Sequence, residues 1–308
     1  MVKIAADKLH PKARAIVDQL GALPPLPTLT PAQARGGPVP LAAAPEAVAS
    51  VTARTIPGPG GPMAIRIYRP NDSLRAALVY FHGGGWVVGS LESADGSCRI
   101  LANRSRCVVI SIDYRLAPET KFPGAVEDAY AAVGWVSDHA ADLGIDPTRI
   151  AVGGASAGGN LAAAAALVAR DRGGPKIAFQ LLTVPVTELS PKAESHRGFA
   201  EGYGLTSADM TWFGTHYVRT PTDADDPYAS VLRADLHGLP PAFVITAECD
   251  PLRDDGEAYA EKLRKLGIRA SYKRYAGTFH SFMSFPGTLP EATQAFDDAG
   301  AALREALG

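Results

Sequence analysis

The most restrictive feature of the sequence is a serine between two glycines, placed where an apolar strand turns into a helix. Residues 150–161 read Ile-Ala-Val-Gly-Gly-Ala-Ser-Ala-Gly-Gly-Asn-Leu. Glycine at Gly154 and Gly158 permits a turn too sharp for side chains, so the hydroxyl of Ser156 projects from the strand end. The backbone N–H of Ala157, at the start of the predicted helix, can donate to a negatively charged oxygen. The pattern predicts a nucleophilic serine at a strand-to-helix corner.

A Gly-x-Ser-x-Gly pattern is short enough to arise by chance, so its meaning depends on the rest of the chain. The simplest alternative is an ordinary glycine-rich turn between a strand and a helix. A phosphate-binding loop is disfavoured, because Gly159 and Asn160 stand where such a loop carries Lys and Ser or Thr.

Apolar strands alternate with helical segments on both sides of the serine. Strands are predicted at residues 76–81, 107–112, 177–184, 242–247 and 268–275, and from residue 150 up to the corner at Ser156. Helices are predicted at residues 95–104, 124–141, 157–170, 254–266 and 289–307. A β-hairpin comes before them, with residues 51–56 and 63–68 joined by Pro-Gly-Pro-Gly-Gly. This order predicts an α/β fold with a mostly parallel central sheet and helices on both faces.

Two regions depart from the alternation. Residues 3–22 predict an amphipathic helix, and residues 23–45, with seven prolines, predict a semi-rigid connection. Residues 189–230 carry aromatic side chains among glycines and polar residues, which we interpret as a helical cap; a long excursion with its own small core is the alternative. We therefore expect an N-terminal cap segment at 1–48, an α/β core at 49–188 and 231–308, and a cap insertion at 189–230.

Composition narrows the classes of partner. A formal net charge of −2 over 308 residues provides no basic surface for nucleic acid or anionic membranes. No apolar run reaches the ~18 residues of a membrane span, and none near the start has signal-peptide length. The three cysteines match neither a zinc site nor a disulfide framework, which fits a reducing compartment. We expect a cytoplasmic protein that acts on a small molecule.

A nucleophilic serine requires a neighbouring base, and the base requires an acid that orients it. On a sheet of this kind the three groups follow in the order Ser, Asp or Glu, His. His280 lies in a predicted loop after a late strand and is the expected base. Asp250 stands just beyond the strand at 242–247, at the carboxyl edge of the sheet, and is the expected acid. Glu248 is the alternative acid.

A developing oxyanion requires backbone donors that face the serine. A run of three glycines, Gly83, Gly84 and Gly85, follows the strand at 76–81 and can turn its N–H groups toward a ligand. With Ala157 these residues form the predicted oxyanion hole, and Gly84 and Gly85 are favoured within the run. A flexible turn without this role is the alternative. His82 is expected to be structural.

Five motifs together resemble the bacterial hormone-sensitive lipase family (family IV) of α/β-hydrolase esterases. They are His82-Gly-Gly-Gly-Trp86, Asp113-Tyr-Arg-Leu-Ala-Pro-Glu119, Gly154-Ala-Ser-Ala-Gly-Gly-Asn-Leu161, Asp250-Pro-Leu-Arg-Asp254 and His280-Ser-Phe282. The resemblance extends from about residue 50 to residue 308. It implies an α/β-hydrolase fold with a helical cap, a catalytic triad of Ser156, Asp250 and His280, and hydrolysis of short- to medium-chain acyl esters without cofactor or metal. Ala155 departs from the Asp or Thr that usually precedes the nucleophile.

Two other functions remain open at this point: hydrolysis of amides or N-acyl groups by the same triad, and ligand binding without catalysis. The second is disfavoured by the presence of His280, which the plant gibberellin receptors of this type lack. Large apolar side chains of the cap and the site loops are the predicted pocket walls: Trp86, Phe199, Tyr203, Trp212, Leu252 and Phe282. The last predicted strand, which begins at Ile268 and ends at Tyr275, could pair with its copy in a homodimer.

Overall fold

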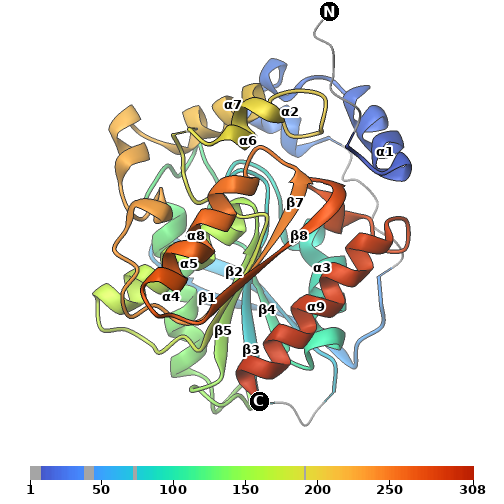
Figure 1. The fold of residues 1–308 in the computed structure, drawn as a ribbon. Helices are drawn as coiled ribbons and strands as arrows, with labels where there is room; N and C mark the ends of the chain where they lie inside the picture. Colours follow the sequence, from blue (N-terminus) through green and yellow to red (C-terminus); the bar gives the residue numbers. More distant parts are fainter. Residues whose placement is uncertain (1–7, 38–44, 72–74, 191) are drawn as a thin grey trace, which may run out of the picture.

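A computed structural model describes residues 8–37, 45–71, 75–190 and 192–308, and a single eight-stranded sheet forms its centre (Figure 1). The strand order is β1-β2-β4-β3-β5-β6-β7-β8. β1 and β2 form an antiparallel hairpin, and β2 pairs antiparallel with β4. All pairs from β4 to β8 are parallel. The predicted fold class, a mostly parallel α/β sheet, is confirmed.

Each strand expected from the sequence is present. The strands are β1 (Ser50–Gly58), β2 (Gly61–Arg69), β3 (Ala77–Phe81), β4 (Val108–Ile112), β5 (Ile150–Ala155), β6 (Phe179–Thr183), β7 (Ala242–Cys249) and β8 (Ala270–Phe279). The prediction for β8 was wrong at its end, because the strand continues four residues beyond Tyr275. Between the pairs Ala247–Tyr275 and Cys249–Phe279, β7 advances two residues and β8 advances four. This bulge in β8, with Gly277 at a φ of 68°, lets the ladder resume at Cys249 and Phe279.

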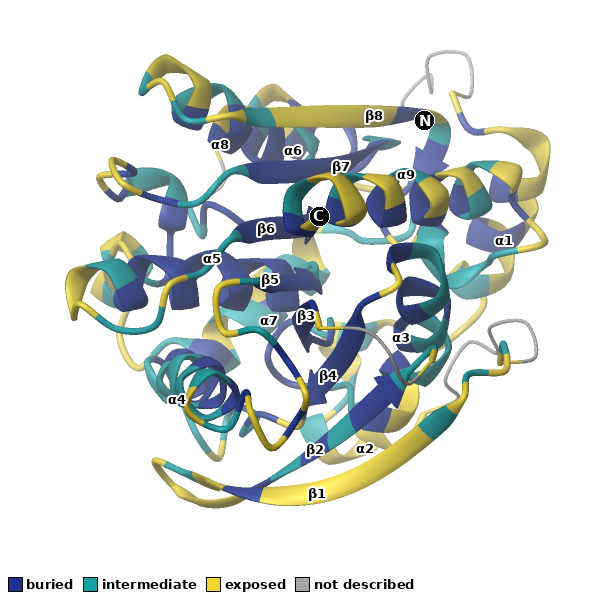
Figure 2. Ribbon diagram, turned by 90° about the horizontal axis from the view of Figure 1, so that it is seen from below, coloured by how far each residue is buried: buried dark blue, intermediate teal, exposed yellow. Residues whose placement is uncertain are grey.

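Helices cover both faces of the sheet (Figures 1 and 2). α3 (Leu91–Ser105) and α9 (Pro290–Leu307) pack together on one face. α4 (Gly124–Asp138), α5 (Ala157–Asp171) and α8 (Arg253–Lys265) lie on the other. The strand β3 shows why the central strands are continuously apolar. Val79 and Phe81 belong to the core beneath α4 and α5, whereas Leu78 and Tyr80 belong to the core beneath α3 and α9. Burial of each such side chain away from water stabilises the folded state by roughly 1.5–3 kcal/mol.

The N-terminal region contains more helix than the sequence indicated. α1 (Pro11–Gly21) begins at a proline, and residues 3–7 of the predicted helix lie outside the described residues. Between residues 23 and 37 the expected connection includes a 3-10 turn, η1 (Leu26–Thr28), and a short helix, α2 (Pro31–Arg35). Proline suits the first turn of a helix, and a capping box between Thr30 and Gln33 closes the start of α2.

These N-terminal helices lie over the end of the sheet where the parallel strands finish. α6 (Glu194–Gly198) and α7 (Ser207–Tyr217), from the region between β6 and β7, lie at the same end (Figure 1). The indole N–H of Trp212 in α7 donates to the carbonyl of Leu29, which joins the two regions. Three further 3-10 turns are η2 (Pro221–Asp225), η3 (Val231–Arg233) and η4 (Phe282–Ser284). None of the helices in the described ranges has both the length and the apolar character needed to cross a lipid bilayer.

Candidate active site

Ser156 stands at a sharp corner between β5 and α5. Its backbone has φ 56° and ψ −116°, which turns the chain from strand to helix within one residue. A Cβ atom on Gly154 would lie 2.4 Å from the carbonyl of Gly158, and one on Gly158 would lie 2.0 Å from the carbonyl oxygen of Phe81. The two glycines of the Gly-x-Ser-x-Gly pattern are therefore required by close backbone contacts, as the sequence analysis expected.

The pairing of β7 with β8 brings two distant residues together. Cys249 and Phe279 are partners in the ladder, so the next residues on the two strands, Asp250 and His280, leave the sheet side by side. His280 Nδ1 lies 2.8 Å from Oδ2 of Asp250. His280 Nε2 lies 2.9 Å from Oγ of Ser156. The three side chains form one continuous hydrogen-bonded chain at the carboxyl edge of the sheet.

The environment of this chain defines the direction of its hydrogen bonds. Asp250 is fully buried, and its other oxygen, Oδ1, accepts from the N–H of Leu252 at 2.9 Å. An ionised carboxylate only accepts, so Nδ1 of His280 carries the proton that it donates to Asp250. Nε2 is then free to accept a proton from the hydroxyl of Ser156. The arrangement can remove a proton from the serine and stabilise the imidazolium that results.

The alternative acid, Glu248, is engaged elsewhere. Its Oε2 accepts from the N–H of Gly277 at 2.8 Å, within β8. The structure therefore places Asp250, and not Glu248, against the imidazole of His280.

The run of three glycines lies next to the serine. A Cβ on Gly83 would lie 3.1 Å from the carbonyl oxygen of Ala155 and 3.7 Å from Cβ of Ser156. Gly84 and Gly85 have φ values of 117° and 57°. No described residue accepts a hydrogen bond from the N–H of Gly84 or Gly85. Both amides thus lack an acceptor within the described part of the chain, as donors of an oxyanion hole must.

His82 is built into the structure as an uncharged ring. Its ring stacks on Tyr114 at a centroid distance of 4.3 Å, and its Nδ1 lies 2.8 Å from the carbonyl of Gly83. Burial lowers the pKa of His82 to about 4. A neutral imidazole that orients the carbonyl of Gly83 fits the structural role expected from the sequence.

The insertion between β6 and β7 is tied to the loop that carries Asp250. Ser195 Oγ donates to the carbonyl of Pro251 at 2.6 Å, and its N–H donates to Asp254 at 2.8 Å. Next to it, His196 Nε2 lies 2.5 Å from Oδ2 of Asp255, with both side chains buried. These anchors could not be predicted from the sequence, since no local pattern links positions 59 residues apart.

The predicted pocket walls are all buried: Trp86, Phe199, Tyr203, Trp212, Leu252 and Phe282. Trp86 stacks on Tyr217 at 4.0 Å, and Phe199 meets Tyr203 edge-on at 5.1 Å. These contacts are typical of packed core, and the assignment of the six residues to a substrate pocket stays a prediction.

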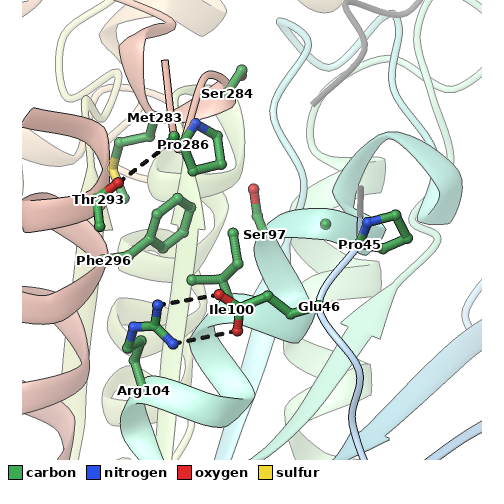
Figure 3. A pocket seen from close by; sticks show the side chains of 12 residues that line it. Pro45, Glu46, Ser97, Ile100, Arg104, Met283, Ser284, Pro286, Thr293 and Phe296 are labelled. Carbon is green, nitrogen blue, oxygen red and sulfur yellow. Dashed lines mark hydrogen bonds and ion pairs between the residues drawn. The ribbon is translucent and has the colours of Figure 1, made fainter. Parts of the chain in front are cut away.

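A separate cavity of about 310 Å³ lies between α3 and the start of α9 (Figure 3). Arg104 and Glu46 form an ion pair at one end of it, and Phe296 and Ile100 supply apolar walls. Its lining includes neither the triad nor any predicted pocket wall. This cavity is therefore distinct from the site at Ser156.

Comparisons with known proteins give the family and the activity of the chain. Residues 78–284 match a family model described as the alpha/beta hydrolase fold. The chain is 44% identical over 248 residues to the carboxylic ester hydrolase LipN of Mycobacterium tuberculosis, covering 78% of this chain and 66% of LipN. It is 45% identical over 234 residues to an arylesterase of Saccharolobus solfataricus, covering 75% of this chain and 76% of that enzyme.

A solved structure gives the same result across nearly the whole chain. The hyperthermophilic esterase of Pyrobaculum calidifontis superposes with a TM-score of 0.91 at 45% identity, covering 96% of this chain and 98% of that one. The three proteins named are all described as ester hydrolases, which favours ester hydrolysis over the amide-hydrolase and binding-protein alternatives. The chain therefore belongs to the bacterial hormone-sensitive lipase family (family IV) of α/β-hydrolase esterases, and it is a serine carboxylesterase.

Proposed function

We propose that Ser156, His280 and Asp250 carry out ester hydrolysis in two acyl-transfer steps. The observation that supports this assignment is the hydrogen-bonded chain of 2.9 Å from Ser156 to His280 and 2.8 Å from His280 to Asp250. These distances lie within the range required for proton transfer between a nucleophile and its base.

In the first step, Oγ of Ser156 attacks the ester carbonyl carbon while its proton moves to Nε2 of His280. The carbonyl oxygen becomes an oxyanion, which accepts hydrogen bonds from the N–H groups of Gly84, Gly85 and Ala157. When the tetrahedral intermediate collapses, the C–O bond to the alcohol breaks and Nε2 returns the proton to the leaving oxygen. The product is an alcohol and an acyl group bonded to Ser156.

In the second step, water takes the place of the alcohol. His280 accepts one proton from water, and the oxygen attacks the acyl carbon. The bond to Ser156 then breaks, and the proton on Nε2 returns to Oγ. The acid is released and the serine is regenerated. Asp250 stays ionised throughout and stabilises the imidazolium of His280.

We further propose that the substrates are small esters with short to medium acyl chains. The N-terminal helices and α6–α7 lie over the end of the sheet that carries Ser156, which supports a capped site (Figure 1). A relative from Pseudomonas putida, 38% identical over 243 residues, is named ethyl acetate hydrolase. A site beneath such helices suits a small dissolved ester better than a lipid surface.

A panel of p-nitrophenyl esters tests both proposals. Wild type should hydrolyse the butyrate and hexanoate much faster than the palmitate. Ser156→Ala should lose several orders of magnitude in kcat, whereas Ser97→Ala, a serine at the separate cavity, should match wild type. A fluorophosphonate should label Ser156 covalently. Wild-type activity in Ser156→Ala would refute the site, and preference for palmitate would refute the substrate class.

We also propose a homodimer formed through β8. This strand is the last in the sheet, and β7 is its one partner among the described strands. Its residues 271–274 are exposed (Figure 2), and the carbonyl of Gly277 accepts from the N–H of His10. Tyr272 is 37% exposed on this edge, while Val51, 36% exposed, lies on the opposite edge in β1. Free N–H and C=O groups at such an edge can pair with a second copy.

Light scattering at micromolar concentration tests the dimer. Wild type and Val51→Glu should have the mass of a dimer, and Tyr272→Glu should be monomeric, because each copy would bring a carboxylate into the paired edge. A monomeric wild type would refute the dimer.

We also propose a cytoplasmic location, which the cysteine content supports. Cell fractionation tests it, and recovery of the protein outside the cytoplasm would contradict it.

A further inference from the structure

The turn that carries the oxyanion donors has an unfavourable backbone. Gly84, Gly85 and Trp86 have φ values of 117°, 57° and 62°, all in the left-handed region. Trp86 carries a Cβ atom, so this backbone conformation is strained for it. Residues in such conformations persist only where their surroundings hold them in place. The contacts around this turn therefore decide whether the N–H groups of Gly84 and Gly85 point toward Ser156.

Inside the turn, two amides close the backbone on itself. The N–H groups of Val87 and Val88 both donate to the carbonyl of Gly84, at 3.1 and 2.9 Å. The carbonyl of Trp86 accepts from the N–H of Ala117 at 2.8 Å. The carbonyl of Val87, which ends the turn, finds its donor outside the core.

That donor is Arg35, the last residue of α2. Its Nε donates to the carbonyl of Val87 at 2.8 Å, and its Nη2 donates to the carbonyl of Ala117 at 2.7 Å. The guanidinium also forms a bidentate pair with Glu119, at 2.8 and 2.7 Å. One side chain of the N-terminal region thus binds both segments that shape the turn. The fork of Arg provides this combination, and a lysine ammonium does not.

Side chains of α7 press on the same turn. A Cβ on Gly85 would lie 2.1 Å from Cδ1 of Phe213, so the ring leaves no room for a side chain there. The ring of Tyr217 stacks on Trp86 at a centroid distance of 4.0 Å. α7 is in turn bonded to the N-terminal region through Trp212 and Leu29. The helices over the sheet therefore reach the oxyanion turn from two directions, and Arg35 provides the polar contact.

We propose that Arg35 is a positioning residue for ester hydrolysis, which holds the oxyanion turn in its active shape through the carbonyl of Val87. The proposal depends on the function proposed for Ser156 and the glycine amides. Arg35 touches no reacting atom. The hydrogen bond from Arg35 lowers the pKa of Glu119 to about 2, so the partner of Arg35 is an ionised carboxylate at neutral pH.

Arg35→Ala should lower kcat for p-nitrophenyl butyrate about ten- to a hundredfold while KM changes less than about threefold, since a misplaced donor weakens only the transition state. Arg35→Lys should show a smaller loss in the same direction. Arg172→Ala is the matched control. It removes another bidentate arginine pair, with Glu127, at the far end of α5 from Ser156, and should stay within about twofold of wild type.

An inhibitor pair separates positioning from mere stabilisation. A trifluoromethyl ketone forms an oxyanion on Ser156, whereas the matching methyl ketone binds as an ordinary carbonyl. In Arg35→Ala the affinity for the trifluoromethyl ketone should fall by the same factor as kcat/KM, with the methyl ketone unchanged. A merely structural residue would lower the melting temperature and leave the ratio of the two affinities as in wild type.

Wild-type kcat/KM and inhibitor ratio in folded Arg35→Ala would overturn the proposal. If that variant fails to fold, Arg35→Lys decides by the same measurements, because it keeps the charge next to Glu119 and loses the fork. Failure of the proposed function has a different signature: wild type itself would not react with a fluorophosphonate at Ser156.

Discussion

Replacing Ser156 by alanine and by glycine separates its chemistry from its backbone strain. Ser156 has φ 56° and ψ −116°, a region that only glycine enters easily. A side chain there costs about 1–3 kcal/mol. Glycine avoids this cost, but the greater entropy of its unfolded chain lowers the free energy of unfolding by about 0.5–1 kcal/mol. The free energy of unfolding of Ser156→Gly should therefore exceed that of Ser156→Ala by about 1 kcal/mol.

The hydrogen bonds of Ser156 do not contribute to the difference in stability between the two variants. Its N–H donates to the carbonyl of Thr183 at 2.9 Å, and its carbonyl accepts from the N–H of Asn160 at 3.0 Å. Both are backbone contacts that alanine and glycine retain. Both variants also lose the hydroxyl and with it the hydrogen bond to His280. What remains is the cost of a Cβ atom in this conformation.

Calorimetry of the two variants provides the measurement, with an expected difference of roughly 2 °C in Tm for a chain of this size. The same pair of changes at Ser97, inside α3, is the control. There the backbone is helical, so glycine should be less stable than alanine by about 1 kcal/mol. A Ser156→Gly variant that melts below Ser156→Ala would refute the strain argument.

Two further predictions concern the surroundings of the site. Gly158→Ala should destabilise the protein by about 3 kcal/mol or more, because the new Cβ would lie 2.0 Å from the carbonyl oxygen of Phe81. Gly134→Ala, where a Cβ meets nothing within 4 Å in α4, should be neutral or stabilising in the same denaturation experiment. Folded His82 stays neutral down to its pKa of about 4, whereas unfolded histidine binds a proton below about pH 6.5. Acid therefore favours the unfolded state in this window, and wild type should lose about 3 kcal/mol more than His82→Phe between pH 7 and pH 4. Parallel pH curves for the two proteins would contradict this.

Much of the fold follows from patterns that are local in the sequence. Apolar runs such as the one that forms β3 predict strands covered on both faces, because each side chain alternates between two cores. The glycines around Ser156 predict the sharp corner, since no other residue tolerates backbone atoms at 2.0–2.4 Å from a Cβ. The order of Ser156, Asp250 and His280 predicts the triad, because these residues follow separate strands of one sheet.

Other features depend on register and on contacts between distant segments. Only the pairing of Cys249 with Phe279, after a bulge in β8, sets Asp250 beside His280 and leaves Glu248 bonded to Gly277. A one-residue difference in register would turn these side chains to the opposite face, and no local pattern specifies it.

The contacts of the N-terminal region also depend on the tertiary structure. Nothing in the sequence around Arg35 distinguishes it from a solvent-exposed arginine. In the structure its guanidinium donates to the carbonyl of Val87, 52 residues further along the chain. Local periodicity predicts that a helix forms and which of its faces is apolar. It does not indicate which distant carbonyl will complete the hydrogen bonds of a guanidinium, because that depends on how the packed helices and strands meet in space.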